Sequence, residues 1–263
     1  MPIDPPLLAV ALGNSRLRLG TFIEGKLTQT DSQPLNAPES IADQLGDDFE
    51  TAFHPIRERD GASILFTSTN PAATPAVEAI LRDRLKFPYQ RVETDVNIPV
   101  GRQLDREAIV GEDRLLNAAA AYDTLKQACM VIDAGTAITL DFVDGAGTFH
   151  GGAIAPGAQL MLDALDHRFP QLPAIEFAKP EEPIGHNTTQ AMLSGTFHGI
   201  RGMARELLEQ FAEATGQFPT VVATGGDADL LFREWDLIDR LVPDLTLLGL
   251  QLTARKAAEA EHE

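Results

Sequence analysis

The same short pattern occurs twice in this chain, at a separation of about 120 residues. Both LLAVALGNSRLRLG (Leu7–Gly20) and VIDAGTAITLDF (Val131–Phe142) contain an apolar run, a glycine turn and a segment with alternating apolar residues. Solenoid proteins repeat every 20 to 50 residues or so, about half this period or less, so the pattern predicts two copies of one domain that face each other. The cleft between two such domains is a common ligand site. From the repeat alone, a chance similarity between two buried strands that each precede a glycine stays open.

The two copies differ in kind at one aligned position. When the glycine turns are superimposed, Ala11 stands where the second copy has Asp133. The first copy therefore lacks a carboxylate that the second copy carries.

Composition limits the classes of partner. The 263 residues suffice for one large or two modest domains, and 44% hydrophobic with 23% charged residues is typical of globular proteins. A formal net charge of −18 argues against a nucleic acid or an anionic membrane as partner. An anionic small molecule can still bind, because backbone amide dipoles and a metal ion override the global field locally.

The N-terminal apolar run does not have the order of a secretion signal. No Lys or Arg precedes Leu7–Leu12, whereas Arg16 and Arg18 follow it, and no apolar stretch reaches the length of a membrane span. We therefore expect a cytosolic protein. The single cysteine, Cys129, lies in an apolar run and is expected to be a buried residue at the start of a strand rather than a reactive thiol.

Strand-like and helix-like segments alternate along the chain, which favours an α/β architecture. Strands are predicted at Leu7–Leu12, Arg16–Phe22, Ser63–Thr69, Cys129–Gly135, Ala137–Val143 and Thr220–Gly226. Helices are predicted at Thr74–Leu85 with Thr74 as the cap, at Arg106–Lys126, at Thr188–Ala214 and from about Thr246. A turn is expected at Asp144–Gly147 and a long surface loop at Pro170–Pro183.

Three glycine turns follow apolar strands and are candidate phosphate-binding loops. They begin at Gly13, Gly135 and Gly225. Glycine lets backbone N–H groups approach a phosphate closely, and the small hydroxyl or amide side chains beside it add donors. None matches GxxxxGK[ST] or GxGxxG. Each turn alone is more often a structural turn than a phosphate loop, whereas all three in this order are more specific.

A fourth candidate segment, Gly111–Asn117, reads GEDRLLN and opens a predicted amphipathic helix. The helix dipole is expected to lower the pKa of Asp113 near its N-terminus. Such a weak base still suits phosphoryl transfer, in which a loose transition state mainly requires orientation of the attacking hydroxyl. Arg114 offers a fork for a carboxylate. The alternative is that Glu112 and Asp113 only stabilise the helix N-terminus.

Together these segments resemble one family, the type III pantothenate kinases. That family shows DxGNT, GxDR, DxGTATT, GGxIxPG, GxNTxxAMxSG and ATGG; this chain reads, in the same order, ALGNS, GEDR, DAGTAIT, GGAIAPG, GHNTTQAMLSG and ATGG. Leu245–Leu250 resembles the family's C-terminal stretch, so the resemblance spans nearly the whole chain. It implies an α/β, actin-like fold with two ribonuclease-H-like domains, related by internal duplication and separated by a cleft. The two halves would be residues 1–122 and 123–263, with a final helix that can pack back on the first half.

The resemblance also implies a reaction. Members transfer the γ-phosphate of ATP to the hydroxyl of pantothenate, forming 4'-phosphopantothenate in the first step of coenzyme A biosynthesis. It implies Mg²⁺ and a monovalent cation, K⁺ or NH₄⁺, as cofactors. It further implies a cytoplasmic homodimer whose substrate site lies near the subunit interface.

Carried over motif by motif, the resemblance implies roles for individual residues. Asp113 would be the catalytic base that aligns the hydroxyl, and Asp133 would lie at the monovalent-cation site. Pantothenate would be contacted by Gly111, Glu112, Asp113, Arg114 and Thr188, with Leu104 at an aligned substrate position. ATP would be bound near Gly13, Asn14, Ser15, Arg18, Gly135, Thr136, Gly225 and Gly226.

The chain departs from the family pattern at two positions that would face ligands. Ala11 replaces the first aspartate, and a methyl group holds neither a divalent ion nor its water shell. Losing one group that stabilises transition-state charge commonly costs about 10²- to 10³-fold in rate. Leu104 stands near the place of a family tyrosine, which removes a polar contact to substrate. Ser15 for Thr and Arg18 for Lys keep the chemistry of the family residues.

These departures leave three hypotheses. The first is a working kinase whose Mg²⁺ is held mainly by ATP, Asp133 and water, and the retained Asp113, Arg114 and Thr188 favour it. The second is a catalytically weakened homologue that acts as a ligand-binding or regulatory protein. The third, a sugar kinase or another actin-like ATPase, does not account for GEDR together with HNTTQAMLSG.

Overall fold

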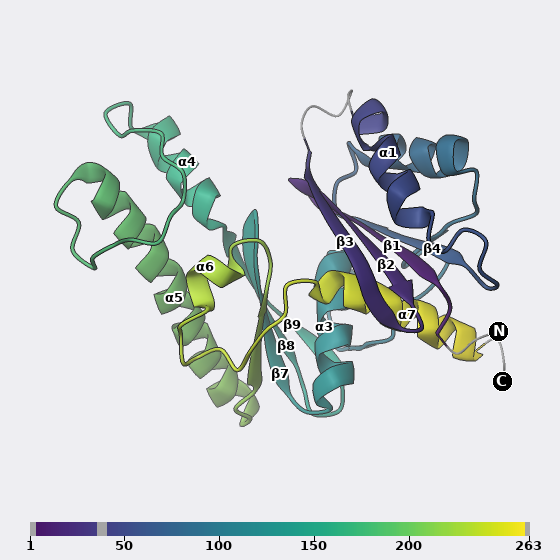
Figure 1. Ribbon diagram of the computed structural model, residues 1–263. Coiled ribbons are helices and arrows are strands. Elements are labelled where there is room, and N and C mark those ends of the chain that lie inside the picture. The colour runs from purple at the N-terminus through teal and green to yellow at the C-terminus, as the bar shows by residue number, and fades with distance from the viewer. Residues whose placement is uncertain (1–3, 36–40, 261–263) are drawn as a thin grey trace. The chain divides into compact units, whose positions relative to one another are not determined.

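The computed structural model describes residues 4–35 and 41–260, and these form two compact units (Figure 1). The first unit contains the chain up to Val100, Glu107–Ala120 and the C-terminal stretch from Leu245. The second contains Gly101–Arg106 and Ala121–Asp244. The chain therefore enters the second unit twice, at Gly101 and at Ala121, and returns to the first unit at Glu107 and at Leu245.

The first unit is built on a five-stranded sheet. Its strands are β1 (Leu7–Leu12), β2 (Arg16–Ile23), β3 (Lys26–Pro34), β4 (Ser63–Ser68) and β5 (Gln90–Arg91), in the spatial order β3-β2-β1-β4-β5. The first three strands pair antiparallel, whereas β4 and β5 run parallel to β1. Tight turns suffice between antiparallel neighbours, but the parallel strands require helical crossovers.

Helices cover both faces of this sheet. They are α1 (Ile41–Phe53), α2 (Thr74–Ala79), the π-helix η2 (Ile80–Leu85), the start of α3 (Glu112–Leu125) and α7 (Leu245–Ala260). One sheet face, with Val10, Leu19 and Phe66, forms the core with α1, α2 and η2. On the opposite face, Gly20 leaves room for α7, because a Cβ there would lie 3.0 Å from Cδ1 of Leu247.

The second unit is built on a six-stranded sheet. Its strands are β6 (Gly101–Arg102), β7 (Cys129–Ala134), β8 (Ala137–Val143), β9 (Thr148–Pro156), β10 (Thr220–Thr224) and β11 (Arg240–Leu241), in the order β11-β10-β7-β8-β9-β6. The three helices that lie wholly within this unit are α4 (Ala158–Arg168), α5 (Thr188–Thr215) and α6 (Ala228–Phe232). Ile132, Leu140, Phe197 and Val221 belong to a core shared by the sheet and these helices.

The two sheets repeat one topology. The order β3-β2-β1-β4-β5 matches β9-β8-β7-β10-β11, with the same antiparallel and parallel pairings at every step. The aligned positions also keep their partners, since Ala11 pairs with Thr67 on β4 and Asp133 pairs with Thr224 on β10. The internal duplication predicted from the repeat is confirmed, and a chance likeness between two strands is excluded.

Two predicted helix starts are wrong. Thr74 is not the cap of α2: Ala73 holds that position without a side-chain cap bond, and the Thr74 hydroxyl donates to the Asn70 carbonyl (2.8 Å). The helix predicted from Arg106 begins only at Glu112, directly after Gly111. The second half of the helix predicted at Thr74–Leu85 is a π-helix.

Other elements carry too little local signal for prediction. The edge strand β3 has only one strongly apolar residue, Leu27, and its pairing with β2 defines it. Helices α1 and α4 and the two-residue strands were also not predicted. Cys129 is buried at the start of β7 as expected, and burial raises the pKa of its thiol to about 12. Within the described ranges, no helix is long and apolar enough to cross a membrane.

Candidate active site

In the first unit, the β1–β2 turn is tied to the loop that follows β4. The Gly13 N–H donates to the Arg16 carbonyl (2.9 Å), which closes the turn. The Asn70 side-chain amide donates to the Asn14 carbonyl (3.3 Å), and the Thr69 N–H donates to the Leu12 carbonyl (2.9 Å). Asn70 was not singled out in the sequence, because only the folded sheet places it beside a turn 56 positions away.

The α3 N-terminus holds the Asp113 carboxylate in a fixed position. Its Oδ1 accepts a hydrogen bond from the Arg114 N–H (2.8 Å), and that N–H also approaches the Gly111 carbonyl (3.1 Å). A Cβ on Gly111 would lie 2.6 Å from Asp113 Oδ1. The glycine of the GEDR segment is therefore needed so that this carboxylate can fold back against the backbone.

The prediction that the helix dipole lowers the pKa of Asp113 is wrong. Burial raises the pKa of this carboxyl above its ordinary value, although the Arg114 N–H and the Arg114 charge act in the opposite direction. Removing the carboxylate from water disfavours its charged form more than the helix terminus favours it. Asp113 is thereby a stronger proton acceptor than the sequence suggested.

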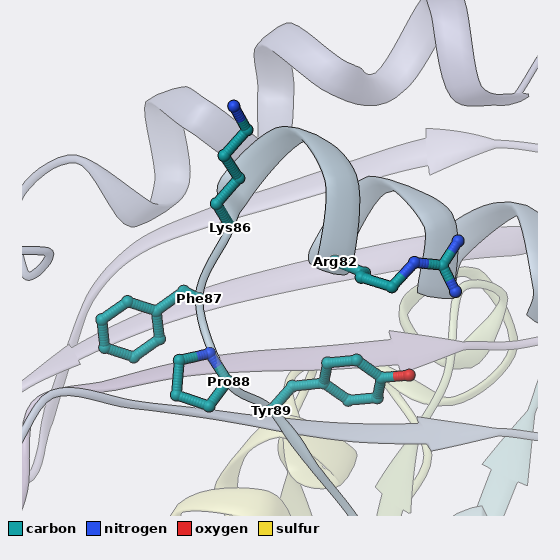
Figure 2. Close-up of a pocket in the computed structure, with 5 residues that line it drawn as sticks. All are labelled: Arg82, Lys86, Phe87, Pro88 and Tyr89. Atoms are coloured by element: carbon teal, nitrogen blue, oxygen red, sulfur yellow. The ribbon is translucent and has the colours of Figure 1, made fainter.

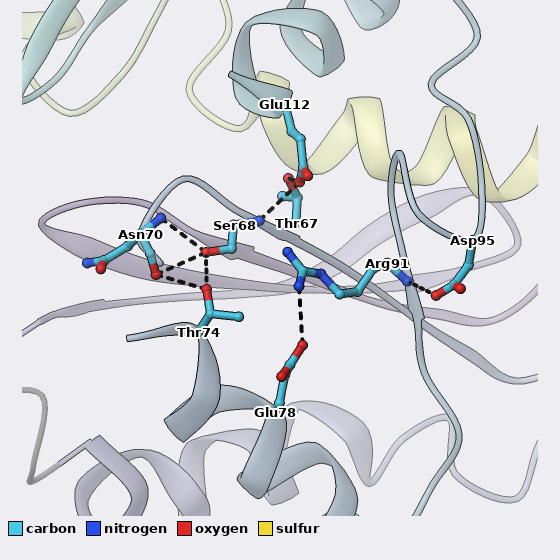
Figure 3. Close-up of polar contacts among 8 residues, drawn as sticks. All are labelled: Thr67, Ser68, Asn70, Thr74, Glu78, Arg91, Asp95 and Glu112. Atoms are coloured by element: carbon cyan, nitrogen blue, oxygen red, sulfur yellow. Dashed lines mark hydrogen bonds and ion pairs between the residues drawn. The ribbon is translucent and has the colours of Figure 1, made fainter. Parts of the chain in front are cut away.

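Glu112 connects α3 to the end of β4. As Figure 3 shows, its carboxylate reaches from α3 to the last two residues of the strand. Oε2 accepts hydrogen bonds from the Thr67 hydroxyl (2.6 Å) and the Ser68 N–H (3.2 Å). The side chain thus fixes the start of α3, and with it Asp113, on the sheet.

The same end of β4 carries a cluster of short polar side chains. The Ser68 and Thr74 hydroxyls are hydrogen bonded to each other (2.7 Å), and the Asn70 N–H donates to Ser68 Oγ (3.1 Å; Figure 3). These bonds shape the loop from which Asn70 reaches the β1–β2 turn. The cluster joins two of the sequence-predicted segments, Gly13–Ser15 and Gly111–Arg114, through one loop.

In the second unit, the turns after β7 and β10 lie against each other. A Cβ on Gly225 would lie 2.3 Å from the Ala134 carbonyl oxygen and 2.5 Å from Asp133 Oδ1. Gly225 also has a φ of +99°, a conformation that favours glycine. The Asp227 N–H donates to the Ala134 carbonyl (2.9 Å). Asp133 and the predicted nucleotide glycines Gly225 and Gly226 are thus brought together.

A glycine that the site prediction omitted completes this arrangement. The Gly157 N–H donates to the Thr136 carbonyl (2.9 Å), and a Cβ on Gly157 would lie 2.1 Å from the Gly135 carbonyl oxygen. It is the last glycine of GGAIAPG, one of the segments that resemble the family motifs. The β7–β8 turn therefore packs directly on the start of α4.

Two predicted substrate positions lie elsewhere in the second unit. Thr188 is the first residue of α5, after Asn187, whose side chain accepts the Gln190 N–H (2.9 Å). Thr188 lines a hollow of about 740 Å³ between α4 and α5, together with Pro156 next to Gly157. Leu104 lies near β9, since a Cβ on Gly151 would be 3.5 Å from its Cδ2.

A hollow of about 480 Å³ on the first unit lies away from these segments. Figure 2 shows its lining by Arg82, Lys86, Phe87, Pro88 and Tyr89, at the end of η2 and just before β5. Because β5 begins beside Leu65, this hollow is near the amino end of β4, whereas the polar cluster follows the carboxyl end. Ligands of open α/β sheets bind outside the carboxyl ends of strands, so this hollow is not the candidate site.

The family relationship follows from comparison with known sequences. The sequence pattern of the family described as type III pantothenate kinase matches residues 7–210. The chain belongs to the type III pantothenate kinase family. A type III pantothenate kinase of Dehalococcoides mccartyi is 33% identical over 252 residues, covering 94% of this chain and 96% of the relative. One from Parafrankia sp. is 34% identical and covers 96% and 99%.

Solved structures support the fold. Component A of (R)-2-hydroxyglutaryl-CoA dehydratase from Acidaminococcus fermentans superimposes with a TM-score of 0.56 at 13% identity, covering 98% of this chain and 100% of that chain. MreB5 of Spiroplasma citri gives a TM-score of 0.52 at 12% identity, covering 98% and 99%. Likeness at such identities concerns the fold alone. With the duplicated sheets, it establishes the two-domain actin-like fold of this type III pantothenate kinase family member.

Proposed function

We propose that this chain phosphorylates pantothenate with ATP, giving 4'-phosphopantothenate and ADP in the first step of coenzyme A biosynthesis. The observation that carries the proposal is Asp113 of the GEDR segment. This carboxylate is held at the α3 N-terminus by the Arg114 N–H, has a raised pKa and belongs to a family motif. It is suited to orient an alcohol and accept its proton.

In the proposed reaction, the hydroxyl oxygen of pantothenate forms a bond to the γ-phosphorus of ATP while the bond from that phosphorus to the ADP oxygen breaks. The hydroxyl proton passes to the Asp113 carboxylate. Gly111, Arg114 and Thr188 would bind pantothenate, with Arg114 available for its carboxylate. The backbone of Glu112 would lie in the same contact segment.

The family motifs assign the nucleotide contacts to the glycine turns. The proposed contacts are Gly13, Asn14, Ser15 and Arg18 at and after the β1–β2 turn, and Gly135, Thr136, Gly225 and Gly226 at the turns after β7 and β10. The Asp133 carboxylate beside Gly225 is the proposed oxygen ligand of the monovalent cation, K⁺ or NH₄⁺. Mg²⁺ bound with ATP supplies charge neutralisation on the transferred phosphate.

The first prediction concerns turnover. Purified protein with Mg-ATP is expected to release ADP only when pantothenate is present, and K⁺ is expected to raise the rate relative to Na⁺. A coupled ADP assay with mass detection of 4'-phosphopantothenate measures both. Absence of the phosphorylated product at high enzyme and millimolar Mg-ATP would contradict the proposal and favour the weakened homologue.

We also propose a homodimer, formed through the α4–α5 surface. The hollow between these helices has a mainly apolar lining, in which Leu160 and Phe169 are 46% and 45% exposed. Exposed apolar surface of this kind marks interaction sites. Because Thr188 lines the same hollow, a second copy seated there would contact a proposed pantothenate residue.

The second prediction concerns this dimer. Light scattering on the purified protein is expected to give twice the 28.4 kDa of one chain, and Leu160→Asp is expected to lower the mass to that of one chain. A charged side chain at an apolar interface loses its hydration when the copies associate. A wild-type mass of one chain at micromolar concentration would refute the proposed assembly.

A further inference from the structure

We propose that Glu112 supplies the carboxylate for nucleotide-bound Mg²⁺ that the first copy of the repeat lacks at Ala11. This inference rests on the proposed function, because it concerns the same nucleotide site. It gives Glu112 a role on the metal side of the reaction, whereas the family likeness placed this residue only among the pantothenate contacts.

The register of the sheet places Ala11 next to Thr67. Ala11 on β1 pairs with Thr67 on β4 and with Arg18 on β2. Directly paired residues on neighbouring strands carry their side chains on the same face, about 5 Å apart. The Ala11 methyl group and the Thr67 hydroxyl are therefore side by side, on the face opposite the core formed with α1.

The Glu112 carboxylate is held at Thr67, the β4 partner of Ala11. Its Oε2 lies 2.6 Å from Thr67 Oγ1 (Figure 3). Because Ala11 pairs with Thr67 on the neighbouring strand, the carboxylate is about one strand spacing from the Ala11 side chain. An aspartate at position 11 would place its own carboxylate in this same neighbourhood. The charge missing from β1 is thus delivered from the start of α3.

Glu112 keeps one carboxylate oxygen that can bind an ion. Oε2 takes both hydrogen bonds, whereas Oε1 makes none with the residues that the structure describes. A carboxylate with one anchored and one available oxygen is a suitable monodentate Mg²⁺ ligand. Mg²⁺ commonly binds through one or two carboxylates, substrate phosphates and water. Such a site needs no larger cluster, and the described ranges contain no group of three or more acidic, His or Cys residues that could hold a metal.

Electrostatics explains why the chain carries one of the two carboxylates here. Two like charges about one strand spacing apart repel each other unless a cation lies between them. With Glu112 anchored over Thr67, an alanine at position 11 avoids that repulsion when no nucleotide is bound. Arg18 on the same face adds a positive charge for the phosphates.

The simpler alternative is that Glu112 only fastens α3 to β4. Glu112→Gln separates the two roles, because the amide oxygen can still accept from Thr67 and Ser68 while the charge is lost. A fastening role predicts no change in Mg²⁺ dependence. The metal role predicts a change that a carboxylate restored on β1 reverses.

The experiment titrates Mg²⁺ while calorimetry measures the Kd of a non-hydrolysable ATP analogue. For Glu112→Gln we expect the Mg²⁺ concentration for half-maximal tightening to rise about 10- to 100-fold, the range seen when groups that tune metal sites are altered. The double variant Ala11→Asp/Glu112→Gln is expected to recover most of the loss. Glu107→Gln, an exposed acidic residue of the same unit, is the matched control and is expected to leave the titration unchanged.

Mn²⁺ binding followed by electron paramagnetic resonance provides a second readout that needs no turnover. Fewer Mn²⁺ ions bound with the analogue are expected for Glu112→Gln. If Glu112→Gln does not fold, Thr67→Val provides a second test, because it removes only the hydroxyl that anchors Oε2. In this variant too, the Mg²⁺ concentration for half-maximal tightening is expected to rise.

Three outcomes would overturn the inference: unchanged Mg²⁺ dependence in Glu112→Gln, no recovery in the double variant, or no Mg²⁺-dependent nucleotide binding by the wild type. A failure of the proposed function alone gives another result. Glu112→Gln would then still change the Mg²⁺ dependence of analogue binding, while the wild type would not phosphorylate pantothenate.

Discussion

Replacing Asp113 by Asn is expected to lower kcat about 10²- to 10⁴-fold, the usual contribution of a positioned general base. The amide can still accept from the Arg114 N–H, so the geometry at the start of α3 is preserved. It cannot take the hydroxyl proton of pantothenate. Because a general base acts in the transition state, the proposed role predicts a small change in KM beside the large change in kcat.

The same substitution has a predictable effect on stability. Burial raises the pKa of the Asp113 carboxyl, so the folded state binds its proton more tightly than the unfolded chain does. This stabilising contribution is fully present below pH 3.8 and is lost as the pH rises through the raised pKa of the folded state. At neutral pH the buried charge destabilises the fold, and Asp113→Asn is expected to unfold at an equal or higher denaturant concentration than the wild type.

Steady-state kinetics and urea unfolding at pH 7 test both statements. Exposed Asp105→Asn, outside the proposed catalytic groups, is a matched control that should change neither quantity. The wild-type rate is expected to fall at low pH as Asp113 becomes protonated, at a pH above the ordinary carboxyl pKa. Full activity in Asp113→Asn would remove this residue from the mechanism.

Replacing Gly225 by Ala is expected to damage both stability and nucleotide binding. The new Cβ would lie 2.3 Å from the Ala134 carbonyl oxygen and 2.5 Å from Asp133 Oδ1, and the φ of +99° is strained for any side chain. Strained backbone alone costs about 1–3 kcal/mol. Relief of the clash requires the two turns to separate, which displaces the Asp133 carboxylate.

Gly226→Ala is the matched control for stability. A Cβ there meets nothing within 4 Å, so its free energy of unfolding is expected to stay near that of the wild type. Urea unfolding measures the stability difference, and calorimetry with an ATP analogue measures the affinity. Equal stability of the two alanine variants would show that the β7 and β10 turns do not need this contact.

The elements with strong local patterns were predictable from sequence. Long apolar runs gave β1, β4 and β10, and the helical pattern of Thr188–Ala214 gave α5. The edge strand β3 was missed because its polar residues acquire a β-conformation through pairing with β2. The true start of α3 was missed because Glu112 is fixed by β4, a contact across 45 positions.

The order of the motifs determined the family and the residue types available for chemistry. A glycine turn, a GEDR segment and a second glycine turn with Asp133 are local facts, readable one by one. The alignment of the two copies also exposed the missing carboxylate at Ala11. The sequence alone determines these features, because they depend only on which residues occur and in what order.

Only the tertiary structure decided the surroundings of two of the carboxylates. The pKa of Asp113 rises because neighbouring segments exclude water from it, which outweighs the helix-terminus effect that the sequence predicted. The carboxylate of Glu112 is bonded to Thr67, the residue of β4 that pairs with Ala11 of β1. Burial and pairing between distant segments are properties of the packed chain, so no local pattern reports them.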